Sequence, residues 1–152
     1  VDQIKYLGGL DGKMTKEEEK QLRATEEAAR EIQSPALAPS AVLTVLGAKV
    51  PGSYFLDLRN YKQAEVAAGL TIPILVLQAE RDYQVTMKDF DGWKKALAGK
   101  ANVTFKIYPG LTHLFMPSLT PGTGPGTPAD YEKPQHVSES VIADIADWIM
   151  KK

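Results

Sequence analysis

The hydrophobic pattern predicts two buried strands, each followed by a polar turn. The first is the apolar run from Ile74 to Leu77, which Pro73 bounds and a polar, turn-forming group ending in Asp82 follows. Four apolar residues with β-branching and a bounding proline are typical of a buried strand. The second strand is the alternating segment Val103–Tyr108, which Pro-Gly ends and His113 follows.

A helix between these strands completes a βαβ unit. Residues 87–97 place three large apolar side chains on one helical face: Phe90, Trp93 and Leu97. Strand, helix and strand in this order predict parallel strands with a right-handed crossover. A last helix, starting near Val137, carries an apolar stripe that we expect to pack on the sheet, formed by Val137, Val141, Ile142, Ile145, Trp148 and Ile149.

The pattern of the first half of the chain predicts a block of helices. Thr15-Lys-Glu-Glu18 is a capping box, which predicts a mostly solvated helix running to about Gln33. A short apolar helix is expected from about Pro39 to Gly47, and residues 54–61 have apolar positions at helical spacing. Residues 15–69 are therefore predicted to be helical, with no strand of note.

Residues 117–134 form a long loop that is rich in proline and glycine. Loops of this length inside a compact domain are usually functional or mobile. The glycines do not make a phosphate-binding loop, because no Gly-Lys-Ser/Thr is present and no strand leads directly into the loop.

Composition narrows the class of protein. The apolar fraction of 43%, the charged fraction of 24% and the net charge of −1 are ordinary for a globular protein. This charge gives no reason to expect nucleic acid or an anionic membrane surface as a partner, and no apolar run is long enough to cross a bilayer. With no cysteine, disulfides and thiolate catalysis are excluded, while the cellular compartment stays open.

Two buried parallel strands cannot make a complete sheet. Parallel sheets have helices on both faces and more strands than two, and a two-stranded sheet leaves an open edge and an uncovered face. We therefore interpret the chain as part of a larger fold, and expect either a missing partner half or self-association.

Asp82 and His113 are the candidate catalytic residues. Taken singly, Asp82 is more often a turn residue and His113 a structural histidine. Neighbouring parallel strands, however, bring residues just past their carboxyl ends together. A carboxylate facing one imidazole nitrogen fixes the tautomer and leaves the other nitrogen free to act as a general base.

Three segments resemble the C-terminal half of an α/β-hydrolase, in the branch of the dienelactone hydrolases and prolyl-oligopeptidase-like esterases. These segments are Leu77-Gln-Ala-Glu-Arg-Asp82-Tyr-Gln-Val85, Tyr108-Pro-Gly-Leu-Thr-His113-Leu-Phe115, and the stretch from His136 to Ile149. The resemblance implies an α/β fold with a parallel βαβ unit, in which Asp82 is the triad acid and His113 the triad base. It further implies a helical cap or insertion over residues 1–69 and the hydrolase core over residues 70–152.

The resemblance implies hydrolysis of a carboxylic ester, or less readily an amide or peptide, by a Ser-His-Asp triad with no cofactor. The sequence differs from the family pattern at the nucleophile, because the family's Gly-x-Ser-x-Gly elbow does not occur in it. Ser53 lacks the glycine spacing, and Ser118 lies too close to His113 in the chain. The chain alone is therefore expected to be inactive, with the serine in a missing N-terminal half.

Other assignments are secondary. Leu114 and Phe115, beside the base, could line an acyl pocket or pack under the loop. His136 is expected to cap the last helix, and nothing in the spacing supports a metal site from Asp82, His113 and His136.

A non-catalytic binding or scaffold module remains an alternative function. Its weakness is that a module without catalysis has no need of both Asp82 and His113. The absence of a glycine-rich turn after the first strand argues against a nucleotide-binding domain.

Overall fold

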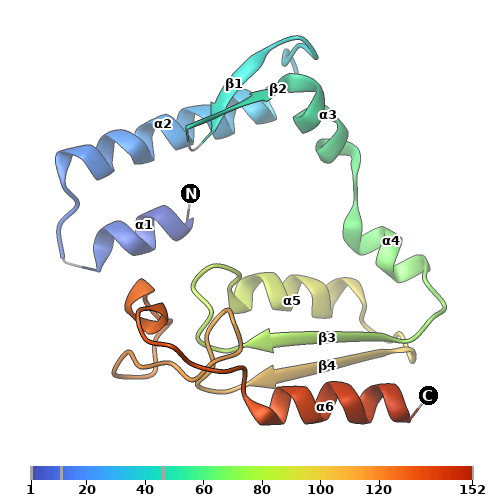
Figure 1. Cartoon of the computed structure of the whole chain (residues 1–152). Helices are drawn as coiled ribbons and strands as arrows, with labels where there is room; N and C mark the ends of the chain where they lie inside the picture. Colours follow the sequence, from blue (N-terminus) through green and yellow to red (C-terminus); the bar gives the residue numbers. More distant parts are fainter. Residues whose placement is uncertain (1, 11, 46, 152) are drawn as a thin grey trace. The chain divides into compact units, whose positions relative to one another are not determined.

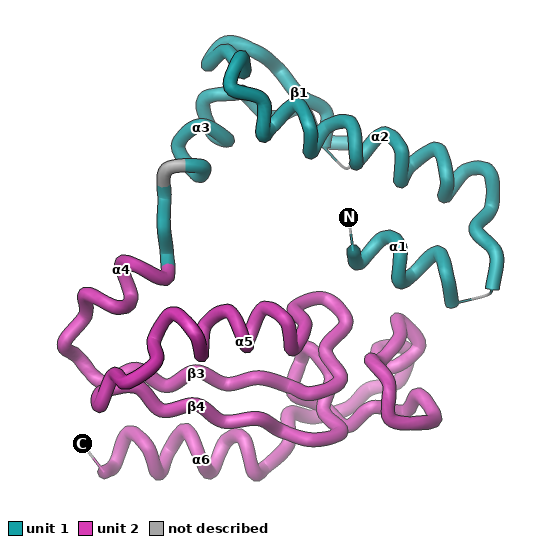
Figure 2. The backbone as a smooth tube through the Cα atoms, turned by 180° about the vertical axis from the view of Figure 1, so that it is seen from behind, with its two compact units in different colours: residues 1–63 teal, residues 64–152 magenta. Residues whose placement is uncertain are grey.

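The computed structural model describes residues 2–10, 12–45 and 47–151. The chain forms two compact units, Val1–Gln63 and Ala64–Lys152, which Figure 2 shows in teal and magenta. Each unit has its own secondary structure.

The first unit combines helices with a β-hairpin. Its elements are α1 (Asp2–Gly9), α2 (Lys16–Gln33), β1 (Val42–Val45), β2 (Ala48–Pro51) and α3 (Gly52–Asn60). The predicted capping box starts α2: the Glu18 N–H donates to Thr15 Oγ1 at 3.2 Å, and the Thr15 N–H donates to the Glu18 carboxylate at 2.7 Å. Ala28 is the buried residue of α2, so the prediction of a mostly solvated helix is confirmed.

The hairpin corrects the prediction of an apolar helix from about Pro39 to Gly47, and with it the prediction that residues 15–69 contain no strand. β1 and β2 pair antiparallel, with Val45 opposite Ala48. Gly47 has a φ of 82°, which a tight turn requires and a right-handed helix forbids. The β-branched residues of β1 also favour an extended backbone, and Leu43 alone in β1 is fully buried.

The second unit is a small layered α/β structure. Its elements are α4 (Gln63–Gly69, beginning at the boundary), β3 (Ile74–Ala79), α5 (Met87–Ala96), β4 (Val103–Tyr108), the short 3-10 helix η1 (Pro128–Tyr131) and α6 (Glu139–Met150). β3 and β4 are parallel, in a register running from Ile74 opposite Val103 to Ala79 opposite Tyr108. The sheet lies between α5 and α6 (Figure 1). The predicted βαβ unit is thus confirmed, and α4 lies within residues 15–69, which were predicted to be helical.

Aromatic packing holds α5 on its face of the sheet. Phe90 and Leu97 are almost completely buried. The Phe90 ring meets the Phe105 ring edge-on, with centroids 5.7 Å apart. This geometry is favoured between aromatic quadrupoles and fixes α5 against β4.

The opposite face of the sheet carries a small core under α6. Val141 packs with Ala79, Tyr108 and Leu111. The Tyr108 hydroxyl donates to Asp144 on α6 at 2.9 Å, and Lys106 forms an ion pair with the same carboxylate. Burial, reinforced by the neighbouring Asp144 carboxylate, raises the pKa of Tyr108 to about 12.

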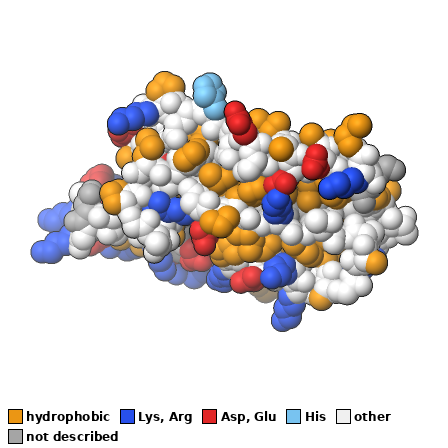
Figure 3. Space-filling model, turned by 90° about the horizontal axis from the view of Figure 1, so that it is seen from below, with side chains coloured by type: hydrophobic (Ala, Val, Ile, Leu, Met, Phe, Trp, Pro, Cys, Tyr) orange, Lys and Arg blue, Asp and Glu red, His pale blue; other side chains and the backbone are white. Residues whose placement is uncertain are grey.

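Only part of the apolar stripe of α6 packs on the sheet. Val141 is buried, but Ile142, Ile145 and Ile149 are exposed by 57%, 38% and 57%. The prediction that the whole stripe packs on the sheet is therefore wrong for these three residues, and also for Val137, which is 42% exposed and precedes α6. In Figure 3 the face seen from below, the side on which α6 lies, shows hydrophobic side chains gathered between scattered charges.

β3 is likewise incompletely covered. Its residues from Ile74 to Leu77 are only half-buried, and within the described residues β3 pairs with β4 alone. None of the helices in the described ranges is long and apolar enough to cross a membrane.

Replacing Tyr108 with Phe tests the link between β4 and α6. Loss of the hydrogen bond to Asp144 should lower the free energy of unfolding by about 1 kcal/mol in urea titrations at neutral pH. The folded-state pKa near 12 lies above the unfolded value of about 10, so this contribution is complete below about pH 10 and is lost as the pH rises through about 12. An ultraviolet titration should therefore lose its latest-titrating tyrosine in Tyr108→Phe.

The control is Tyr61→Phe, at a residue that is 57% exposed in the first unit. Equal stability of the two variants, with the latest-titrating tyrosine still present in Tyr108→Phe, would contradict a role for the Tyr108 hydroxyl.

Candidate functional site

The site is built where the two parallel strands end. Beyond the paired residues Ala79 and Tyr108, the Glu80 N–H donates to Tyr108 O at 3.0 Å and the Arg81 N–H donates to Leu111 O at 2.9 Å. These bonds extend the strand pairing into the loops. The turn after β3 and the turn after β4 are thereby held side by side.

Asp82 is fixed by its own turn. The side chain is 6% exposed, and its Oδ1 accepts hydrogen bonds from the Gln84 and Val85 N–H groups at 2.7 and 2.9 Å. The buried Gln78 amide donates to the carbonyl oxygens of Ala79 and Val85, so the turn is also tied to β3. Both backbone N–H bonds go to Oδ1, so Oδ2 remains as the second acceptor.

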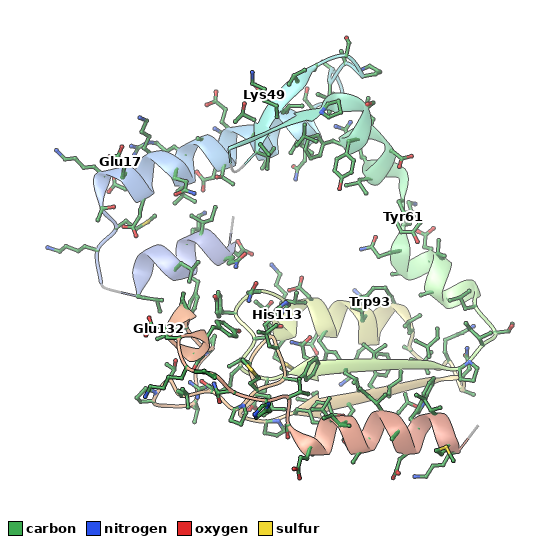
Figure 4. The ribbon with its side chains drawn as sticks, viewed as in Figure 1. Glu17, Lys49, Tyr61, Trp93, His113 and Glu132 are labelled. Carbon is green, nitrogen blue, oxygen red and sulfur yellow. The ribbon has the colours of Figure 1, made fainter. Side chains whose placement is uncertain are left out.

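His113 meets that acceptor. Its Nδ1 lies 2.8 Å from Asp82 Oδ2, and the side chain is 36% exposed. No group in the described part of the chain bonds Nε2, so this nitrogen is free to exchange a proton with another molecule. Figure 4 shows His113 at the end of the sheet toward which the strand arrows point. The sequence predicted these two residues, and the structure brings them together.

The turn that carries His113 is held by hydrogen bonds within the turn. Thr112 is completely buried, and both its N–H and its hydroxyl donate to Met116 O, at 2.9 and 3.1 Å. Phe115 has a φ of 55°, a left-handed conformation that is uncommon for an aromatic residue, and its N–H donates to Thr112 O at 2.8 Å. A strained residue of this kind persists only where its surroundings over-determine it.

The two residues after the histidine have different environments. The Phe115 ring packs edge-on against Tyr108, with centroids 5.8 Å apart, and joins the core under α6. Leu114 is 51% exposed beside His113. Of the two, Leu114 has the side chain that is open to a small molecule.

The remaining candidates lie elsewhere. Ser138, not His136, is the N-cap residue of α6, and His136 is exposed, so the prediction that His136 caps this helix is wrong. Ser118 donates its hydroxyl to Asp130 at 3.0 Å, and Ser53 lies in α3 of the first unit. The described residues contain no cluster of three or more His, Asp or Glu side chains that could hold a metal ion.

Sequence reasoning missed two buried charged residues, Arg81 and Asp130, which are 6% and 0% exposed. Asp130 lies inside the loop that composition marked as functional or mobile. One signal was available: Thr127 and Asp130 have the spacing of a capping box, and the structure contains that box at the start of η1. Arg81 gave no signal beyond its place next to Asp82.

Comparison with known proteins gives two matches. The model of the dienelactone hydrolase family matches residues 40–149. The esterase EstD of Thermotoga maritima is 45% identical over 107 residues, which are 70% of this chain and 24% of the relative. The chain thus spans about a quarter of the length of this curated relative. No solved structure matches.

The family match covers most of the second unit, including both turns of the site, and the relative is named as an esterase. The family match is compatible with the parallel α/β unit that the structure shows. The chain therefore belongs to the dienelactone hydrolase family of the α/β-hydrolase superfamily.

Proposed function

We propose that this chain carries the acid and the base of a serine hydrolase that acts on carboxylic esters, with amides or peptides as less favoured substrates. The observation that carries the proposal is the 2.8 Å contact between Asp82 Oδ2 and His113 Nδ1. The name of the relative, an esterase, supports the ester as substrate class.

Each residue has a defined role in this proposal. A serine hydroxyl attacks the ester carbonyl while His113 Nε2 accepts its proton, and the protonated imidazole then delivers that proton to the leaving alcohol. Asp82 holds the tautomer with the proton on Nδ1 and stabilises the imidazolium as it forms. Leu114, exposed beside the base, contributes to an acyl pocket, whereas the packed position of Phe115 fits a supporting role.

The nucleophile is proposed to lie outside these 152 residues. No Gly-x-Ser-x-Gly elbow occurs in the sequence, and the Ser118 hydroxyl donates its hydrogen bond to Asp130. The edge of β3 that no strand of the described residues pairs with and the exposed isoleucines of α6 are the surfaces that the rest of a hydrolase core would cover. In this proposal residues 70–152 belong to the core, residues 1–69 are an inserted cap, and the chain alone does not turn over ester.

Asp82→Asn, made in the longest natural form of the polypeptide, tests the acid. Turnover of a p-nitrophenyl ester should fall by about three to four orders of magnitude, because an amide no longer selects the productive tautomer. Circular dichroism should be unchanged. Asp91→Asn, at an exposed residue of α5, is the matched control and should keep full turnover. Equal activity of the two variants would remove Asp82 from the mechanism.

The chain offers a matched pair for the base, because His113 and His136 are its two histidines. His113→Ala should slow labelling by a fluorophosphonate at least about 10³-fold, since the serine loses its general base. His136→Ala should label at the normal rate. Normal labelling of His113→Ala would overturn the assignment of the base. A folded wild-type polypeptide that takes no label would favour the non-catalytic module instead.

A double substitution tests whether the exposed face of α6 belongs to a larger core. In the longest natural form, Ile142→Lys with Ile149→Lys should lower the free energy of unfolding by more than about 2 kcal/mol, because each lysine would be buried without a partner. In the 152-residue chain the same change should have little effect, since both residues are more than half exposed.

Ala143→Lys, at an exposed position of the same helix, is the control for a change of charge and helix propensity. Equal effects of the double substitution in the long and short polypeptides would contradict a covering hydrolase core.

A further inference from the structure

Residues 117–134, called the strap below, are bonded to both turns of the site. On the side of the base, the Ser118 N–H donates to Gly110 O at 2.9 Å, and Pro117 pairs with Leu111 in an isolated bridge. On the side of the acid, the Gly126 N–H donates to Arg81 O at 2.7 Å. The strap therefore cross-links the segments that precede His113 and Asp82.

Asp130 closes the strap on itself. Its carboxylate is completely buried and accepts three backbone N–H bonds, from Leu119 at 2.5 Å, Thr120 at 2.8 Å and Thr127 at 2.8 Å. The hydroxyls of Ser118 and Thr120 add two bonds at 3.0 Å. Burial alone would raise the pKa of Asp130, but these bonds outweigh it and hold the pKa below its usual value. The group that closes the strap is thus a carboxylate anion.

Arg81 ties the closed strap to the acid turn. This buried residue directly precedes Asp82, and its guanidinium donates to Gly124 O at 2.6 Å and to Thr120 O at 2.8 Å. Thr120 thus accepts from Arg81 while its own N–H and hydroxyl donate to Asp130. One strap residue links two buried charges of opposite sign.

Gly126 shows how closely the strap approaches the turns. A Cβ atom at this position would collide with Asp130 Oδ2 and lie 3.2 Å from Arg81 O and 3.4 Å from Thr112 Cγ2. The contact requires a residue without a side chain. Arg81 belongs to the acid turn and Thr112 to the base turn, so the strap backbone packs closely against both turns.

We propose that Asp130 is a positioning residue, which acts through Thr120, Arg81 and Gly126 to hold the acid turn and the base turn where Asp82 Oδ2 meets His113 Nδ1. This inference deepens the proposed function and rests on it. Asp130 itself touches neither Asp82 nor His113 by a hydrogen bond. Its effect is exerted on the backbone segments that carry the pair.

Proton NMR of the 152-residue chain tests this proposal without requiring activity. A ring N–H that donates a short, charge-assisted hydrogen bond to a carboxylate gives a proton resonance far downfield. The chain has two histidines, and His136 is exposed, so a single such signal from His113 is expected in the wild type. In Asp130→Asn the signal should be lost or broadened beyond detection, while circular dichroism still reports a folded chain.

The matched control is Asp144→Asn, which removes another hydrogen-bonded carboxylate of the same unit, one that binds Tyr108 and Lys106 of β4. It should lower stability yet keep the His113 signal. If Asp130→Asn does not fold, Thr120→Val removes the hydroxyl bond to Asp130 and should weaken the signal in a folded chain.

The outcomes separate the two proposals. A wild-type signal that persists unchanged in Asp130→Asn or Thr120→Val would overturn the positioning role while leaving the acid–base pair intact. No downfield signal in the folded wild-type chain, or one that survives Asp82→Asn, would instead count against the pair itself.

Discussion

The parallel pairing of β3 with β4 is the constraint on which the site depends. Its register places Ala79 opposite Tyr108, so both strands end at the same level. Backbone bonds from Glu80 and Arg81 carry the pairing into the following turns. Asp82 and His113 are 31 positions apart in sequence. They come into contact because the carboxyl ends of neighbouring parallel strands lie at the same end of the sheet.

The same pairing explains what the second unit lacks. A two-stranded parallel sheet has one shared edge and two outer edges, and its apolar strands require cover on both faces. α5 and the Val141 face of α6 provide part of that cover. The half-buried residues of β3 and the exposed isoleucines of α6 remain uncovered. Under the proposed function, the rest of a hydrolase core covers them.

The sequence predicted the features that depend on local pattern. The βαβ unit, the capping box at Thr15 and the Asp82–His113 pair followed from periodicity, cap chemistry and strand ends. The hairpin at β1 and β2 was missed because a four-residue apolar strand has the same composition as a turn of buried helix, and only the φ of Gly47 and the pairing decide between them. The bonds of Arg81 to the loop span 39 to 43 residues, and the bonds of Asp130 to Ser118 and Thr120 span 10 to 12 residues. Residue type and spacing give little signal for contacts of this kind, and only the capping box of Thr127 and Asp130 was visible in the sequence.

The most direct test of the central claim is to identify the serine that this acid–base pair would activate. The longest natural form of the polypeptide is treated with a fluorophosphonate, and the labelled residue is located by intact mass and peptide mapping. The account predicts one label, on a serine of a Gly-x-Ser-x-Gly peptide that lies upstream of Val1. A label on Ser53 or Ser118, or none on a folded polypeptide that still hydrolyses esters, would contradict it.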